Sequence, residues 1–94
     1  MNTKSNVYKN GQVVSEILGD TLTYYYKSGK LKAKGPYIRN KFEGTWLFYS
    51  EDGLLIQEGN FKNNVKDGEW KRYNKDGEIE YSAVFKEGKE IKNK

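Results

Sequence analysis

The chain has 94 residues, a net charge of +4 and a mean hydropathy of −0.99. Only 35% of its residues are hydrophobic, too few for a deep closed core, and no stretch approaches the roughly 20 apolar residues of a membrane span. The lack of cysteine and histidine excludes disulfides, the usual zinc sites and the serine and cysteine triads. Yet 15% of the residues are aromatic, which disfavours disorder and favours a thin sheet that carries large rings.

Residues 1–19 are expected to cap the region that follows. Gly11 and Val13 align with Gly35 and Tyr37 further on, which predicts a truncated half-unit whose strand covers the first edge of a sheet. The alternative is a short helix with four apolar residues on one face: Val13, Val14, Ile17 and Leu18. We favour the strand. No apolar run that could serve as a signal peptide follows residues 1–6, so we expect a soluble, cytoplasmic protein.

From residue 20 onward the chain repeats itself at a fixed interval, in units at 20–43, 44–67 and 68–91. The pattern Gly-x-Trp-x-x-Tyr-x-x-Asp-Gly starts at Gly44 and again at Gly68, and a weaker copy has Leu22 in place of the tryptophan. The second half of each unit also recurs: Leu31, Leu55 and Ile79; Gly35, Gly59 and Ala83; Tyr37, Phe61 and Phe85. A fixed period of this length predicts a repeat architecture within a single domain of residues 1–94.

Each unit is predicted to be a β-hairpin, because runs rich in aromatic and branched residues alternate with turn signals. Residues 27–29, 51–53 and 75–77 match three-residue loops that end in a glycine at positive φ. Residues 39–41 and 63–67 are predicted to link the units, and residues 86–92 to form a last charged strand. No 3.6-residue apolar period appears in the repeats, so an all-β meander follows.

A three-residue loop also predicts which strand residues face each other. It places Tyr49 opposite Leu55 and Leu47 opposite Gln57. Alternation from this register puts the recurring residues on one shared face: Tyr49, Leu55, Gly59 and Phe61. The small residues at Gly35, Gly59 and Ala83 would let neighbouring rings lie against bare backbone. A slip of one residue would send Tyr49 to the other face.

The opposite face is expected to vary from unit to unit. It would change from basic (Lys30, Lys32 and Lys34) to partly apolar (Leu54, Ile56 and Glu58) and then to acidic (Glu78, Glu80 and Ser82). Large apolar residues in the middle of a polar face are typical of an interaction patch. The candidate partner-binding residues are therefore Trp46, Phe48, Leu54, Ile56, Trp70 and Arg72, and the three lysines would steer an acidic partner. The alternative is that this apolar cluster packs under a twist of the sheet or against the N-terminal segment.

Catalysis is not expected from this sequence. Asp52 and Asp76 precede turn glycines, where aspartate stabilises its own turn. Glu78 and Glu80 share one strand face, which is typical of a solvated surface. The glycines come singly at turns and form no phosphate-binding loop. We therefore expect no catalytic residue, no metal and no cofactor.

The spacing Gly-x-Trp-x-x-Tyr-x-x-x-Gly-x-Leu-x-x-x-Gly-x-Phe, found from Gly44 to Phe61, resembles the MORN-repeat family. It is most similar to the bacterial variant of the repeat, found in small proteins assigned as antitoxin components of toxin–antitoxin systems. The resemblance covers about residues 20–91 and implies an elongated, twisted antiparallel sheet of stacked hairpins. For the bacterial branch it also implies neutralisation of a partner protein. The eukaryotic form, linked to membrane phospholipids and protein scaffolding, favours extra Tyr-x-Gly steps that this chain departs from.

These observations favour a non-enzymatic module that binds a protein, as an antitoxin or immunity-type inhibitor that covers its partner's working surface. A second hypothesis is attachment to an anionic membrane surface through the lysine-rich first hairpin, where each lysine would contribute about 1 kcal/mol. A third is weak binding of single-stranded nucleic acid, because four lysines interleave with four tyrosines: Lys27, Lys30, Lys32 and Lys34 with Tyr24, Tyr25, Tyr26 and Tyr37.

Overall fold

A computed structural model describes residues 7–92. Residues 1–6, part of the expected cap, and residues 93–94 lie outside the described residues. Within 7–92 the chain forms nine strands: β1 (Ser15–Leu18), β2 (Thr21–Tyr25), β3 (Leu31–Ile38), β4 (Lys41–Phe42), β5 (Gly44–Tyr49), β6 (Leu55–Lys62), β7 (Val65–Tyr73), β8 (Ile79–Lys86) and β9 (Lys89–Ile91).

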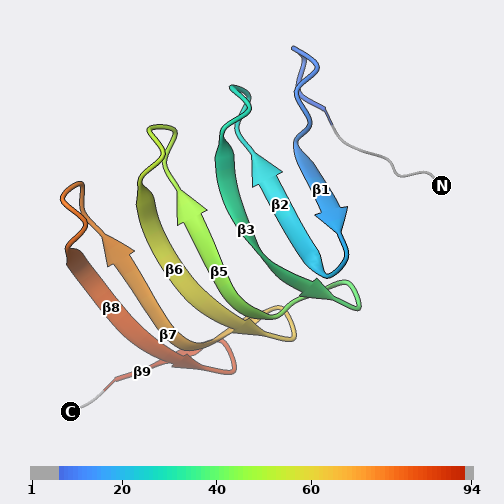
Figure 1. The fold of residues 1–94 in the computed structure, drawn as a ribbon. Helices are drawn as coiled ribbons and strands as arrows, with labels where there is room; N and C mark the ends of the chain where they lie inside the picture. The colour runs from blue at the N-terminus through green and yellow to red at the C-terminus, as the bar shows by residue number, and fades with distance from the viewer. Residues whose placement is uncertain (1–6, 93–94) are drawn as a thin grey trace.

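The strands form one open antiparallel sheet in which neighbours in sequence are neighbours in space (Figure 1). The order is β1-β2-β3-β5-β6-β7-β8-β9, and the short β4 pairs with β3. The molecule measures 49 × 33 × 19 Å along its principal axes. The prediction of an all-β, elongated sheet of stacked hairpins is confirmed.

One border of the sheet carries the three-residue loops, and we call it the loop border (Figure 1). The backbone N–H of Ser50 donates to the carbonyl oxygen of Leu54 at 2.9 Å, and Asn74 donates to Glu78 at 2.8 Å. Gly53 and Gly77 have φ angles of 87° and 82°, which glycine adopts without steric cost. The predicted loops at 27–29, 51–53 and 75–77 are confirmed.

The opposite border, the turn border, carries two-residue turns. Both central residues of the turns at 39–40, 63–64 and 87–88 have positive φ, as in the type I′ turns that match the twist of a hairpin. The predicted links were too long, because Lys41 belongs to β4 and residues 65–67 belong to β7. The last charged strand is confirmed as β9, although Lys86 ends β8.

The N-terminal cap is a strand, and the alternative of a helix is wrong. β1 pairs with β2, and Ile17 lies opposite Leu22. The alignment of Gly11 with Gly35 was also wrong, because Gly11 sits in a loop closed by the N–H of Tyr8 and the carbonyl oxygen of Gln12 at 2.8 Å. Gly11 therefore matches the loop glycine Gly29, and the spacing between these two is shorter than the spacing from Gly29 to Gly53. The cap is a shortened hairpin.

The predicted register holds only near the loop border. Tyr49 does lie opposite Leu55, but the register shifts between Phe48 and Tyr49, so Leu47 lies opposite Glu58. This bulge leaves Ile56 as the extra residue of β6. The same shift recurs between Tyr24 and Tyr25 and between Arg72 and Tyr73.

The bulge corrects the predicted shared face. Gly59 lies opposite Trp46, and Phe61 lies opposite Gly44. Gly59 and Phe61 therefore share a face with Trp46, and Tyr49 and Leu55 lie on the other side. We call the first the aromatic face, defined by Leu22, Ala33, Trp46 and Trp70. The second is the polar face, defined by Thr23, Lys34, Leu47, Glu58 and Lys71.

The core lies on the aromatic face. Its buried side chains are Leu22, Ala33, Trp46 and Trp70. A Cβ placed on Gly35 would overlap the indole of Trp46, and one on Gly59 would overlap the indole of Trp70. Each tryptophan thus lies on the bare backbone of the preceding strand, as the repeated small residues predicted for these two positions.

Each indole is also held by a hydrogen bond to that strand. Trp46 Nε1 donates to the carbonyl oxygen of Pro36 at 2.9 Å, and Trp70 Nε1 donates to that of Asn60 at 2.8 Å. Burial of the indole is thereby achieved without an unsatisfied donor. The pairing of one tryptophan with one glycine is the unit of packing from which the sheet is built.

Candidate functional site

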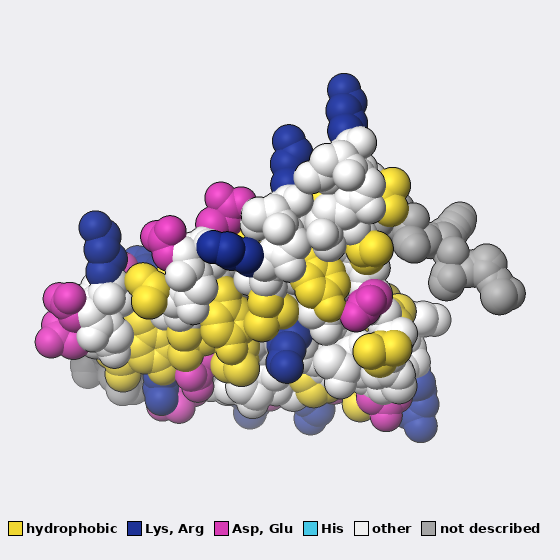
Figure 2. Space-filling view, turned by 45° about the horizontal axis from the view of Figure 1, so that its top comes forward, with side chains coloured by type: hydrophobic (Ala, Val, Ile, Leu, Met, Phe, Trp, Pro, Cys, Tyr) yellow, Lys and Arg dark blue, Asp and Glu magenta, His cyan; other side chains and the backbone are white. Residues whose placement is uncertain are grey.

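The sheet has a hollow at the loop border between the second and third hairpins. We call it the loop groove. It has a volume of about 520 Å³ and is lined by Leu54 and Ile56 from one hairpin and by Tyr73, Lys75 and Glu80 from the next, among others. Leu54 is 44% exposed and Ile56 is 37% exposed. Figure 2 shows hydrophobic side chains gathered in a band across the strands, bordered by charged ones.

The local backbone explains why two apolar residues are exposed here. Leu54 closes the loop, because its carbonyl accepts the N–H of Ser50. Ile56 is the extra residue of the bulge, so it has no partner opposite it on β5. Both side chains therefore lie where the regular pairing between strands ends, and the neighbouring strands do not cover them.

Side-chain hydrogen bonds fix the two loops that flank the groove. Ser50 Oγ accepts the N–H of Asp52 at 3.2 Å and that of Leu54 at 3.3 Å. Asn74 Oδ1 accepts the N–H of Asp76 at 2.9 Å and that of Glu78 at 3.0 Å. The sequence assigned this stabilising role to Asp52 and Asp76, but in the structure the acceptors are the residues that precede the loops.

The six predicted partner-binding residues do not form one exposed patch. Trp46 is 1% exposed and Trp70 is 5% exposed, so both indoles belong to the core. Phe48 lies between them, with ring centroids 6.3 Å from Trp46 and 6.1 Å from Trp70. Both indoles pack on the backbone of a glycine in the neighbouring strand. Of the apolar candidates, Leu54 and Ile56 remain exposed.

Arg72 is exposed but is already engaged. Its Nε lies 3.2 Å from Glu80 Oε2, and its guanidinium carbon lies 5.3 Å from the centroid of the Tyr81 ring. An exposed pair of this kind contributes little to stability, about 0–1 kcal/mol. Its effect here is to hold the carboxylate of Glu80 at the acidic side of the loop groove.

The charges near the loop border change sign along the sheet. Lys30 and Lys32 belong to the first hairpin, and Glu78 and Glu80 occupy the matching positions of the third. Lys32 Nζ lies 5.5 Å from the centroid of the Tyr26 ring. Lys34, the third predicted steering lysine, lies opposite Leu47 on the polar face and is separated from the loop border by the bulge.

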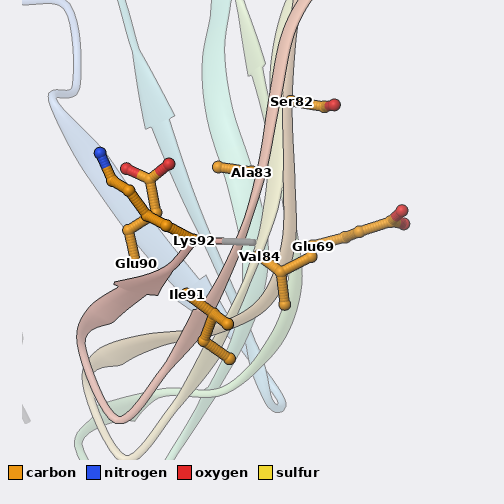
Figure 3. A pocket seen from close by; sticks show the side chains of 7 residues that line it. All are labelled: Glu69, Ser82, Ala83, Val84, Glu90, Ile91 and Lys92. Carbon is orange, nitrogen blue, oxygen red and sulfur yellow. The ribbon is translucent and has the colours of Figure 1, made fainter. Parts of the chain in front are cut away.

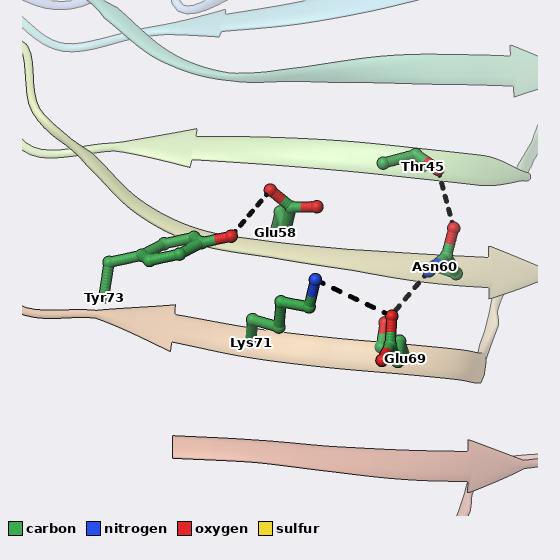
Figure 4. A network of polar contacts seen from close by, with 6 residues as sticks. All are labelled: Thr45, Glu58, Asn60, Glu69, Lys71 and Tyr73. Carbon is green, nitrogen blue, oxygen red and sulfur yellow. Dashed lines mark hydrogen bonds and ion pairs between the residues drawn. The ribbon is translucent and has the colours of Figure 1, made fainter. Parts of the chain in front are cut away.

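The polar face carries a set of hydrogen bonds that tie neighbouring strands together (Figure 4). Thr45 Oγ1 donates to Asn60 Oδ1 at 2.7 Å, and Asn60 Nδ2 donates to the carbonyl oxygen of Glu69 at 2.9 Å. Tyr73 OH donates to Glu58 Oε1 at 3.0 Å. Partial burial of the ring, followed by this bond to a carboxylate, raises the pKa of Tyr73. The raised pKa extends the phenol's role as a hydrogen-bond donor to higher pH than for a free tyrosine, whose pKa is about 10.

Tyr73 is the groove residue that the sequence reasoning missed. The register prediction placed its counterpart Tyr49 on a shared structural face, with no role in binding. The signal that could have identified it is the position next to the loop, where one tyrosine ring borders the apolar residues of the preceding hairpin. Within residues 7–92 there is no group of three or more acidic side chains able to hold a metal ion. That part of the chain also contains no helix long and apolar enough to cross a membrane.

Comparison with known families gives one result. The model of the MORN repeat variant matches residues 21–39, 42–63 and 66–87, together more than half of the chain. No match to a curated protein or to a solved structure was found. The matched segments coincide with the three hairpins, and each contains one residue of the Leu22, Trp46 and Trp70 series. The chain therefore belongs to the family of MORN repeat variant proteins.

Proposed function

We propose that the chain is a non-enzymatic module that binds a protein through the loop groove. MORN repeats are in general modules that bind proteins or lipids, and they form a non-catalytic repeat family. The observation that carries the proposal is the pair Leu54 and Ile56, which are both exposed and both line a hollow of about 520 Å³. An apolar side chain of a partner would fill the hollow and remove both residues from water.

The charges beside the groove support a defined orientation of the partner. The basic first hairpin lies on one side of the second hairpin, and the acidic third hairpin lies on the other. A partner with the complementary arrangement is drawn in faster and in one orientation, while the affinity comes mainly from the apolar centre. Because the loops are fixed by Ser50 and Asn74, little conformational entropy is lost on binding.

In its finer form, the proposal is that binding inhibits the partner by covering its working surface. This form is supported by the resemblance to bacterial antitoxin components and by the open sheet, whose loops beside the groove are held by hydrogen bonds. It requires a partner whose activity can be measured. An enzyme encoded beside this chain is the first candidate to test, with and without equimolar chain.

The test compares two sets of surface variants. Leu54→Asp with Ile56→Asp places two charges in the loop groove, and Ile38→Asp places one on a residue of equal exposure, 37%, at the turn border. Partners captured from the native host are identified and their affinities measured with each purified variant. We expect the groove variant to bind at least about tenfold more weakly, as for loss of a central anchor, and Ile38→Asp to bind normally. Normal binding by a folded groove variant would contradict the proposal.

The same purified variants also test the two alternative functions, lipid binding and nucleic-acid binding. Co-sedimentation with anionic vesicles, or a gel shift with single-stranded RNA, that disappears at high salt would assign the function to the first hairpin. Lys30→Glu with Lys32→Glu would then abolish binding, and the groove variant would not.

A further inference from the structure

Two tyrosines at the loop border reach from one hairpin to the next. Tyr8 OH donates to the carbonyl oxygen of Tyr25 at 2.9 Å, and Tyr26 OH donates to that of Tyr49 at 2.6 Å. Both phenols are half-buried. Their acceptors occupy matching positions, because Tyr25, Tyr49 and Tyr73 recur at the interval of the repeat. Each phenol therefore spans the space between its own hairpin and the following one, and it bonds the backbone on the far side.

The donors of these bonds also occupy matching positions, directly before the loops. Tyr8, Tyr26 and Ser50 each close a loop through their own N–H, which donates to the carbonyl oxygen four residues further on. Serine thus stands in the second hairpin where the cap and the first hairpin have tyrosine. Its Oγ stays within its own loop, where it accepts two backbone N–H groups. In residues 7–92 no side chain is bonded to the carbonyl oxygen of Tyr73, so the third place in the series lacks a phenol.

The loop groove lies at this third place. Ser50 and Tyr73 both line it, and its volume is about 520 Å³. At the matching place one unit earlier, Lys32 Nζ lies 5.5 Å from the centroid of the Tyr26 ring. Ile56 takes the position of that lysine in the second hairpin, and it is 37% exposed. The groove therefore corresponds to the space that a phenol occupies one unit earlier, with an aliphatic side chain in place of the lysine.

Another hollow in the sheet differs from the loop groove in this respect (Figure 3). It has a volume of about 340 Å³, and Val84, Glu90 and Ile91 are among the residues that line it. None of its lining residues directly precedes a three-residue loop, and the hollow extends to Lys92, the last described residue. The comparison between units therefore indicates an occupant for the loop groove and not for this hollow.

The charges of the loop groove favour a neutral donor over an anion. The side chains of Asp52, Lys75 and Glu80 line it, so two carboxylates face one ammonium group. The carbonyl oxygen of Tyr73 is a further acceptor. An unmodified phenol is complementary to these groups, because it brings a donor without a charge. A phosphorylated tyrosine has no such donor, and its negative charge is repelled by the carboxylates.

From this internal template we propose that the loop groove binds an unphosphorylated tyrosine side chain of the partner protein. The ring packs against Leu54 and Ile56, and the hydroxyl donates to the carbonyl oxygen of Tyr73, as the matching phenol does one unit earlier. Tyrosine buries a large apolar ring at a small cost in conformational entropy and keeps a polar tip. The inference rests on the proposed function, because it names the side chain that fills the groove.

The first test places a phenol in the groove from within the chain. Ser50→Tyr should complete the series, and Ser50→Phe is the matched control that lacks the hydroxyl. We expect the midpoint of thermal unfolding of Ser50→Tyr to lie about 4–8 °C above that of Ser50→Phe, because only the phenol bonds the carbonyl of Tyr73. Tyrosine already precedes the loop of the first hairpin, so both variants are expected to fold. Equal midpoints, or a crystal structure with the new phenol in solvent, would overturn the inference.

The second test supplies the phenol from outside. The probes are N-acetyl-tyrosinamide and its phenylalanine and phosphotyrosine counterparts, titrated at millimolar concentration into the isotope-labelled chain. We expect the tyrosine probe to bind about fivefold more tightly than the phenylalanine probe, with amide shifts at Leu54, Ile56 and Tyr73. The phosphorylated probe should bind more weakly than the tyrosine probe, and Ser50→Tyr should abolish binding of all three. Absence of binding, equal binding of the three probes, or shifts outside the loop groove would contradict the inference.

The captured partner separates this inference from the proposed function. Ser50→Tyr should bind the partner at least about tenfold more weakly than Ser50→Ala, because its own phenol occupies the groove. If Leu54→Asp with Ile56→Asp loses the partner while the tyrosine probe does not bind, the proposed function stands and the inference is wrong. If that groove variant keeps the partner, the proposed function itself is wrong. A dimer of the chain that Ser50→Tyr dissociates would overturn the assignment to another protein and assign the groove to a second copy.

Discussion

The two tryptophan units use the same contact with the strand before them but differ in what lies over the ring. Trp46 and Trp70 each lie on a glycine and donate to the carbonyl of the residue that follows it. Phe42 stacks on Trp46, with ring centroids 4.7 Å apart and planes inclined by 21°. At the matching position Lys66 places its Nζ 4.6 Å from the centroid of Trp70. The repeat thus fixes the contact between indole and glycine, while the cover can be apolar or cationic.

The largest expected effect comes from removing the indoles. Trp46→Ala should lower the free energy of unfolding by about 3–5 kcal/mol, because it leaves a cavity among Tyr24, Phe42 and Phe61. Trp70→Ala should cost less, since its ring is covered on one side by a lysine. Urea unfolding followed by circular dichroism measures both. An equal or larger loss for Trp70→Ala would show that the cover does not distinguish the two units.

A smaller loss is expected from the glycines under the rings. Gly35→Ala and Gly59→Ala should each cost about 1–3 kcal/mol, because the new methyl group displaces a rigid indole. Gly53→Asn is the matched control: nothing lies within 4 Å of a Cβ there, and asparagine tolerates the positive φ better than other residues. If Gly59→Ala were as stable as the parent chain, the close contact would not be required.

The cover over each ring can be exchanged between units. Lys66→Phe should stabilise the sheet by about 1 kcal/mol, because it replaces a cation–π contact with a stacked ring. Phe42→Lys should destabilise it by a similar amount. Thermal unfolding at low and high salt separates the two contributions. Should the two substitutions change stability in the same direction, the covers would not be equivalent positions.

The smallest effect concerns pH. Burial of the ring, and to a lesser extent the nearby Tyr37, raises the pKa of Tyr24. The folded state therefore holds this proton more tightly than the unfolded state. The resulting stabilisation is complete below the unfolded pKa of about 10 and is lost as the pH rises through the folded value. Tyr24→Phe should lose less stability than the parent chain between pH 8 and pH 11. Parallel curves for the two proteins would contradict this expectation.

The sequence was sufficient for the hairpins and insufficient for the faces. The loops could be recognised from Gly29, Gly53 and Gly77, because the last residue of each loop needs a positive φ angle, which favours glycine. The bulge at Ile56 leaves no such mark, because an isoleucine is as compatible with a regular strand as with an extra residue. Because the sequence does not reveal this extra residue, the predicted register placed Gly59 and Phe61 on the face opposite Trp46. In the structure they lie on the same face as Trp46.

For the same reason, only part of the candidate site could be predicted from the sequence. Leu54 and Ile56 lie next to a loop whose position was known, so their exposure followed from the hairpin itself. The burial of Trp46 and Trp70 depended on register beyond the bulge, and the amino-acid types alone did not decide between patch and core. The cap was misaligned because its hairpin is shorter than the repeat unit. Extending the period of the later units backward therefore paired Gly11 with the wrong glycine.

The turn border and the loop border differ in how well they would tolerate insertions. At the turn border, Phe42 and Asn64 exchange hydrogen bonds at 2.8 and 3.0 Å, and the carbonyl oxygen of Lys66 accepts the N–H of Gly88 at 2.8 Å, so the turns at 63–64 and 87–88 are fastened to the preceding unit. The loop at residues 51–53 closes on its own strands through Ser50, and nothing lies within 4 Å of a Cβ at Gly53. New segments grafted into this loop would disturb only one hairpin, whereas lengthening a turn would uncouple two. The family could diversify its recognition from this border while it keeps the fastened one constant.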